Sequence, residues 1–372
     1  MRLRSGRTHR GALAAEPIEA CDDGPMRSPQ ARRRRPLVVA AAAIGVAGSL
    51  GAAISAPSAV LAHGPVPAEP PSAANLLLGW SFEPLIVLPL VAAAVGWVAA
   101  TRRVNAAHPA NPVPRIRTVA FLGGLVAIAF ALQSGIERYD TALFSIHMVQ
   151  HVLLILVAAP LIALAAPITL LLRVSRPETR RRRILPVLHS RAVRAVSHPV
   201  VAWVLFVAVM WGTHFSPFFD VALENPWVHD LEHVMYLGVA LLFWWPAVAL
   251  DPSPWRMPHP VRGLYVFLQM PQNTFLAVVI LYAAAPLYPH YATLNRPWGP
   301  SALVDQQVAG GVMWLAGDLL FIAAIGAIVY GWMRFEEKRT ARVDRQSAAE
   351  LAGIRTREAR LAERLAEQQE RR

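Results

Sequence analysis

The sequence predicts an all-α fold: a polytopic membrane helix bundle with seven core transmembrane helices, preceded by one N-terminal signal or anchor helix. Composition, apolar segments and the placement of arginine support this prediction. Hydrophobic residues make up 55% of the 372 residues and charged residues only 16%, whereas a soluble domain carries about 25% charge. Because so few charges cannot cover the surface of a soluble protein of this size, the composition excludes a water-soluble globule.

The apolar segments give the number of spans. A helix needs about 20 apolar residues to cross the hydrocarbon core of a bilayer. The first such stretch follows the basic run 32–35 and ends in small residues before His63, which is the pattern of a signal peptide or signal anchor. Pro160 and Pro167 are expected to kink the longest stretch. The stretches that qualify are 37–62, 84–100, 118–133, 143–172, 199–218, 229–250, 263–285 and 306–333.

Arginine placement predicts the topology. All Lys and Arg residues except Arg138 and Arg296 fall in five segments that alternate with the spans, and basic segments stay in the cytoplasm. These segments are 1–36, 101–117, 173–198, 251–262 and 334–372. The prediction is a multi-pass protein of the cytoplasmic (inner) cell membrane with a cytoplasmic C-terminus. The net charge of +12 is then a topology signal. No nucleic-acid motif accompanies it, so we expect the lipid bilayer, and no nucleic acid, as a partner.

The predicted organisation has five parts. In chain order they are a basic cytoplasmic segment (1–36), the signal peptide or anchor (37–62), an outer segment (63–83), the seven-helix membrane domain (84–333) and a charged cytoplasmic helical tail (334–372).

Five of the twelve histidines lie at the outer ends of three spans. His147 and His151 form one His-x3-His pair, His229 and His233 form another, and His214 ends the span between them. A helix places residues i and i+4 on one face, and neutral imidazole is the commonest metal ligand. Taken singly, each histidine could instead be a residue of the membrane interface. Together, at one depth and on one side, they predict a shared metal site near the outer face.

Neighbouring side chains bear on the identity of the metal. The lone Cys21 cannot form a cysteine-pair site. Thioether and imidazole ligands favour copper, whereas zinc or iron prefers carboxylate or thiolate beside imidazole. We expect copper ahead of zinc, although spacing alone leaves the metal undecided. Possible additional ligands, or residues that orient the imidazoles, are Met148, Met210, Asp230, Glu232, Asp305 and Met313.

Two other interpretations compete for the same histidines. His229 to His233 fits the H-x-x-E-H pattern of inverted zinc proteases, but that scheme gives the first pair no role. Histidines on two membrane helices can also hold haem iron axially. Four histidines would suit two haems, which would be crowded at one depth, so haem is less favoured.

Other polar residues lie inside the spans. Asp318 sits well below the outer face, where a carboxylate must be protonated or paired. It could form a structural hydrogen bond or act as a proton or ion relay. Gln269, Gln272 and Asn273 flank Pro271 and are expected to satisfy the backbone groups that this proline frees.

Several of these motifs together resemble one family. Over about residues 80 to 332 the chain is similar to the caa3-type CtaG family of cytochrome c oxidase assembly proteins, which are seven-helix bacterial membrane proteins. The matching stretches are Trp80-Ser-Phe-Glu-Pro84, His147-Met-Val-Gln-His151 with Ala159-Pro160, Trp211-Gly-Thr-His214-Phe-Ser-Pro217, His229-Asp-Leu-Glu-His233, Gly238, Phe243-Trp-Trp-Pro246, and Asp305-Gln-Gln-Val-Ala-Gly310-Gly-Val-Met-Trp314.

The resemblance implies a non-enzymatic role in maturing a haem–copper oxidase, with cytochrome c oxidase subunits as partners and copper handled at the outer membrane face. We expect the five histidines to bind copper transiently and more weakly as pH falls through about 6.5, because protonated imidazole cannot ligate. The alternatives are a copper permease or a haem-binding membrane protein using the same histidines, and a scaffold that leaves them unoccupied.

Overall fold

The computed structural model describes residues 66–371. The predicted segments 1–36 and 37–62 lie outside the described residues. Within 66–371 all regular secondary structure is helical, with no strand. Six helices are long and apolar enough to cross a membrane, or seven if one bent helix pair counts as a span. The predicted all-α polytopic bundle with seven core helices is therefore confirmed.

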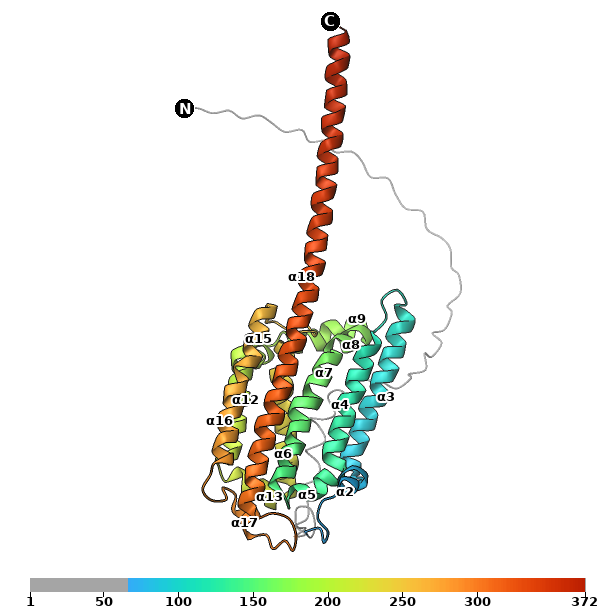
Figure 1. Ribbon diagram of the computed structural model, residues 1–372. Coiled ribbons are helices and arrows are strands. Elements are labelled where there is room, and N and C mark those ends of the chain that lie inside the picture. The colour runs from blue at the N-terminus through green and yellow to red at the C-terminus, as the bar shows by residue number, and fades with distance from the viewer. Residues whose placement is uncertain (1–65, 372) are drawn as a thin grey trace, which may run out of the picture. The chain divides into compact units, whose positions relative to one another are not determined.

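The core spans follow one another in the predicted order (Figure 1). After the short α2 (Ala73–Leu78), the first three spans are α3 (Pro84–Ala107), α4 with α5 (Arg115–Gln133, Gly135–Asp140), and α6, η2, α7 and α8 (Phe144–Val152, Leu153–Ala158, Ala159–Ala165, Pro167–Val174). A connection of short helices follows: α9 (Pro177–Thr179), η3 (Arg180–Ile184), α10 (Leu185–Leu188) and α11 (Arg191–Val196). The remaining elements are α12 (Pro199–His214), α13 (Phe218–Glu224), α14 (Pro226–Val248), α15 and α16 (His259–Phe267, Gln269–Leu281), α17 (Pro289–Thr293) and α18 (Ala302–Glu370).

The third core span is interrupted at both predicted prolines. Pro160 lies in the first turn of α7, directly after the π-helix η2, and Pro167 begins α8 after Ala166, which adopts a left-handed conformation with φ 57°. An interior proline removes a backbone donor and crowds the preceding turn, so such breaks are expected there. Asp251 caps the new helix, accepting hydrogen bonds from the backbone N–H groups of Ile168 and Thr169 at 3.0 and 2.6 Å.

The structure divides the fourth core span, predicted over 199–218 with His214 at its end, into two helices. Helix α12 ends at His214, and α13 continues after a bend of 69°. Pro217 lies in this break, where its ring and missing N–H prevent a regular continuation. The bend turns the chain inward over the end of the bundle and leaves His214 buried at the break.

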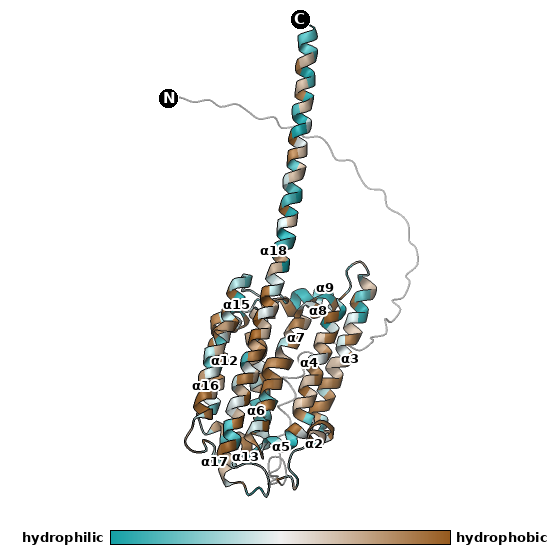
Figure 2. Cartoon of the chain, viewed as in Figure 1, coloured by the Kyte–Doolittle hydropathy of each residue, from teal (hydrophilic) through white to brown (hydrophobic). Residues whose placement is uncertain are grey.

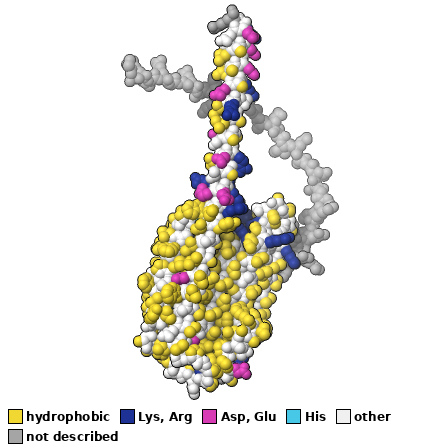
Figure 3. Space-filling model, in the orientation of Figure 1, with side chains coloured by type: hydrophobic (Ala, Val, Ile, Leu, Met, Phe, Trp, Pro, Cys, Tyr) yellow, Lys and Arg dark blue, Asp and Glu magenta, His cyan; other side chains and the backbone are white. Residues whose placement is uncertain are grey.

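The two ends of the bundle differ in charge. Lys and Arg side chains gather near the end from which α18 leaves, while hydrophobic side chains cover the flank (Figure 3). Hydropathy follows the same division, with hydrophobic spans and a mainly hydrophilic continuation of α18 (Figure 2). Helices α5, α13 and α17 lie at the opposite end (Figure 1). The bundle therefore has one basic end and one end closed by short helices.

Asp305 joins two spans at the end where α5, α13 and α17 lie (Figure 1). Its carboxylate, on the first turn of α18, accepts hydrogen bonds from the backbone N–H of Phe144 at 2.6 Å and the hydroxyl of Ser145 at 2.5 Å. The first N–H groups of a helix have no partner within that helix, and α6 has no capping side chain of its own. Asp305 therefore holds the start of α6, the helix that carries His147 and His151.

Close packing of α18 against α16 depends on Gly310. A Cβ atom at this position would lie 2.9 Å from the backbone N of Leu281 and 3.0 Å from the carbonyl O of Ala277, whereas one on Gly311 would meet nothing within 4 Å. Only the first of these two adjacent glycines therefore makes the close approach that small residues permit between membrane helices.

Gly310→Ala should therefore destabilise the protein, and Gly311→Ala serves as the matched control. The added methyl at 310 must push backbone against backbone, which typically costs about 1–3 kcal/mol, whereas alanine at 311 gains helix propensity of up to about 1 kcal/mol. Thermal unfolding of both variants in the same detergent measures the difference. Equal unfolding temperatures for Gly310→Ala and wild type would contradict the packing described here.

Candidate metal centre

Two histidine pairs face one another inside the bundle. The ring centroids of His147 and His151 on α6 are 4.2 Å apart, and those of His229 and His233 on α14 are 4.3 Å apart. Between the helices, the His147–His229 centroids are 5.3 Å apart and the His151–His233 centroids 5.9 Å. Each of the four residues is at most 4% exposed, so the rings lie in the bundle interior and not at its lipid-facing surface.

The start of each helix determines where its pair lies. Helix α6 begins at Phe144 under the Asp305 cap, which puts the α6 pair in its first two turns. Helix α14 begins at Pro226 and is capped by Asn225, whose side-chain oxygen accepts hydrogen bonds from the N–H groups of Trp227 and Val228. Both pairs therefore occupy the first turns of their helices at the same end of the bundle.

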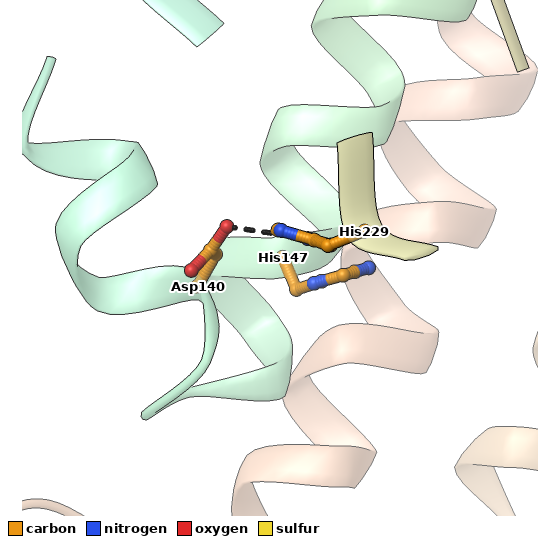
Figure 4. Close-up of side chains that lie close together, drawn as sticks. All are labelled: Asp140, His147 and His229. Carbon is orange, nitrogen blue, oxygen red and sulfur yellow. Dashed lines mark ion pairs between the residues drawn. The ribbon is translucent and has the colours of Figure 1, made fainter. Parts of the chain in front are cut away.

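Three carboxylates complete the group. Glu137 and Asp140 come from α5, and Glu232 lies between the histidines of α14; their exposed fractions are 6%, 0% and 0%. The Nε2 atom of His229 lies 3.5 Å from an oxygen of Asp140 (Figure 4), and the Nε2 atom of His147 lies 3.7 Å from an oxygen of Glu232. We call these seven residues the histidine–carboxylate cluster: Glu137, Asp140, His147, His151, His229, Glu232 and His233.

The ligand atoms of the cluster fall into overlapping triads. In each triad one potential ligand atom from every residue lies within 4.8 Å of the others, close enough to surround an ion. His147 belongs to two triads and Asp140 to two. The triads are Asp140–His147–His229, His147–His151–Glu232 and Glu137–Asp140–His233. The cluster therefore offers more donors than one ion needs, and neighbouring positions share ligands.

Gln150 holds two parts of the cluster together. Its side-chain nitrogen donates to Glu137 at 2.5 Å and to the carbonyl oxygen of Ala131 at 3.1 Å. Its side-chain oxygen lies 3.1 Å from Nε2 of His233, so this ring nitrogen is the donor. Such outer contacts fix the orientation of a ligand and its tautomer. Gln150 thus positions a carboxylate from α5 and an imidazole from α14.

His214 lies beside the cluster but belongs to none of the triads. Its ring is 5.3 Å from that of Phe219 and 6.4 Å from that of Tyr236, centroid to centroid. Its Nδ1 atom lies 2.7 Å from the carbonyl oxygen of Met210 and donates to it, because a carbonyl oxygen can only accept. The structure therefore brings four of the five predicted histidines together and places the fifth next to them.

Several ring nitrogens have no hydrogen-bond partner among the described residues. They are both nitrogens of His147, both nitrogens of His151 and Nε2 of His214. A buried polar group left without a partner costs about 1–3 kcal/mol, and buried groups in proteins are normally paired. A cation bound between imidazoles and carboxylates would satisfy several of these nitrogens at once, so the residues present fit a metal ion.

Helix α17 contacts the end of α5 that carries Asp140. The hydroxyl of Tyr291 donates to the backbone carbonyl of Asp140 at 2.7 Å. Burial, followed by the charges of Asp140 and Asp305, raises the pKa of Tyr291 well above its ordinary value. The hydroxyl therefore stays neutral and keeps this donor role, which fixes the end of α5 that carries Asp140.

The remaining predicted residues divide into three groups. Asp305 is engaged as the cap of α6, and Asp230 is exposed on α14, so neither points to the cluster; Glu232 does. Asp318 accepts a hydrogen bond from Thr274 at 3.0 Å and lies 3.5 Å from Asn273, which favours the structural interpretation over a relay. Three methionines line a cavity beside the cluster: Met148, Met210 and Met313.

Sequence reasoning missed Glu137, Asp140 and Gln150. Both acids lie between the predicted spans 118–133 and 143–172, in a connection where charged residues are ordinary. Their i, i+3 spacing would place them on one face of a helix. Gln150 lies inside the His147–His151 motif. A polar side chain next to two ligand candidates was a signal that it supports them.

The arrangement also bears on the zinc-protease interpretation. That interpretation used His229, Glu232 and His233 and gave the α6 pair no role. In the structure Glu232 lies beside His147 of the α6 pair. Both pairs therefore form one cluster, and the H-x-x-E-H segment is only part of it.

Comparisons with known proteins agree with the sequence motifs. Residues 94–335 match the family described as cytochrome c oxidase caa3 assembly factor (Caa3_CtaG). Uncharacterized proteins of Mycobacterium bovis and Mycobacterium tuberculosis are each 33% identical to this chain over 291 residues, and one of Mycobacterium leprae is 31% identical. No solved structure matches the chain.

These alignments cover 76% of this chain and 44% of each mycobacterial protein, so the chain spans less than half the length of these relatives. The family match extends from α3 into α18 and includes every residue of the histidine–carboxylate cluster. On this evidence the chain belongs to the cytochrome c oxidase caa3 assembly factor family.

Proposed function

We propose that this protein is an assembly factor that binds copper in the histidine–carboxylate cluster and transfers it to a subunit of cytochrome c oxidase. The observation that carries the proposal is that the α6 and α14 histidine pairs are buried and face one another. The ring nitrogens of His147 and His151 have no hydrogen-bond partner among the described residues. Membership of the assembly-factor family supports the oxidase as the destination. Copper is cargo in this scheme, and the protein has no catalytic role.

The charge distribution supports an outward-facing cluster. Basic segments remain on the cytoplasmic side of a membrane protein, and Lys and Arg gather at the end from which α18 leaves (Figure 3). The cluster comes from α5 and the first turns of α6 and α14, and α5, α13 and α17 lie at the other end of the bundle (Figure 1). We infer that it faces the outside of the cell membrane and that the C-terminal part of α18 extends into the cytoplasm.

The overlapping triads suit transient binding. An ion held by one triad can move to the next while keeping His147 or Asp140 as a ligand, so no step requires the loss of all ligands at once. Mixed imidazole and carboxylate donors suit divalent ions, Cu(II) as well as Zn(II) and Fe(II). The family's link to cytochrome c oxidase favours copper among them. Protons compete for the imidazoles, so binding weakens as pH falls and strengthens as it rises.

Replacing one histidine from each pair should remove the metal. We expect the double variant His147→Ala, His229→Ala to bind Cu(II) at least about tenfold more weakly than wild type, because even a change outside the ligand shell typically costs that much. The matched control is His189→Ala, an exposed histidine in the connection between α8 and α12. Metal content after equilibrium dialysis of the purified proteins measures the effect. Equal copper content in the double variant and the control would rule out the shared site.

Assembly and transport make opposite predictions in cells. In a strain that lacks this protein, an assembly role predicts that cytochrome c oxidase activity falls while total cell copper is unchanged. Wild-type protein should restore the activity, and the His147→Ala, His229→Ala variant should not. A fall in cell copper that tracks the loss of oxidase activity would support a permease, and restoration by the double variant would support a scaffold; either outcome contradicts the proposal.

A further inference from the structure

A small cavity lies beside the cluster, deeper in the bundle. It has a volume of about 50 Å³ and is bordered by α6, α12, α14, α16 and α18. Its lining runs from Met148 and His151 of α6 to Leu156 of η2, so it extends from the α6 histidine pair away from the first turn of that helix. The space is sufficient for an ion or for a few water molecules.

Three methionines from three different helices line this cavity. Met148 belongs to α6, Met210 to α12 and Met313 to α18, and their exposed fractions are 2%, 6% and 9%. The thioether sulfur is uncharged and is a soft ligand that selects Cu(I) over hard or highly charged ions. Three of the nine methionines of the chain therefore line one cavity.

Three other residues that line the cavity have polar side-chain atoms without a hydrogen-bond partner among the described residues. They are both ring nitrogens of His151, Nε2 of His214 and the side-chain oxygen of Gln269. These residues are 4%, 4% and 3% exposed. Because Nδ1 of His214 donates to the Met210 carbonyl, its Nε2 carries the free lone pair. His214 and the three methionines line the same cavity, and imidazole with thioether is a donor set for a soft cation.

We propose that this space, the thioether cavity, binds a monovalent soft metal ion, Cu(I), through Met148, Met210, Met313 and His214. The site is distinct from the three triads, which consist of histidines and carboxylates and do not include His214. It deepens the proposed function and rests on it in one respect, since His151 borders both sites. Among the described residues, the lining of the cavity includes no carboxylate, and the histidine–carboxylate cluster includes no thioether. The two adjoining sites therefore differ in the charge and softness of the ion that each prefers.

Titration with Ag(I), a redox-inert monovalent ion with the same preference for sulfur, tests the proposal on the full-length protein in detergent. The triple variant Met148→Leu, Met210→Leu, Met313→Leu should bind Ag(I) at least about tenfold more weakly than wild type. Leucine conserves volume, so the variant keeps its packing. The matched control is Met235→Leu, on α14 and outside the cavity lining. Sulfur neighbours of bound Ag(I), measured by X-ray absorption, should be present in wild type and lost in the triple variant.

Two further outcomes separate this site from the cluster. Cu(II) binding by the triple methionine variant should remain at the wild-type level, and Ag(I) binding should persist in the His147→Ala, His229→Ala variant. Retention of Ag(I) there, with loss only in the methionine variant, supports the thioether cavity even if the oxidase role fails. Wild-type Ag(I) affinity in the triple methionine variant would overturn the proposal and leave water as the occupant of the cavity.

Discussion

The structure depends on one constraint: polar groups placed inside a membrane bundle must find partners there, because lipid offers none. Four imidazoles and three carboxylates lie together at one end of this protein, each at most 6% exposed. Isolated charges in such surroundings are costly. Imidazoles and carboxylates therefore lie next to one another, as His229 does with Asp140 and His147 with Glu232. The ring nitrogens of His147 and His151, which have no hydrogen-bond partner among the described residues, make the cluster suited to a cation.

Much of the surrounding architecture serves to hold these groups in place. Asp305 of α18 caps α6, Asn225 caps α14, and Tyr291 of α17 fixes the end of α5. The bend between α12 and α13 leaves His214 at the border of the cluster and the thioether cavity. Placement by neighbouring helices is what a site needs if binding is to depend on geometry.

The sequence was sufficient for the spans and for the two histidine pairs, because both depend on periodicity along a single helix. Hydropathy located the core membrane spans between α3 and α18. The i, i+4 spacing put each histidine pair on one helical face. Periodicity says nothing about how a segment between spans folds back. That is why periodicity predicted no helix over 134–142, where Glu137 and Asp140 lie, and did not predict α13 after His214. The capping role of Asp305 could not be predicted for a related reason. The group that it caps, the start of α6, is distant in sequence and adjacent only in space.

The central claim is that α6 and α14 bind one ion jointly. The most direct measurement is an anomalous X-ray scattering map of crystals of the copper-loaded protein, recorded at the copper absorption edge. The account predicts a peak within bonding distance of histidines from both helices, with a carboxylate of Asp140 or Glu232 beside it. A peak bound by only one helix, or copper found only outside the histidine–carboxylate cluster, would contradict the account.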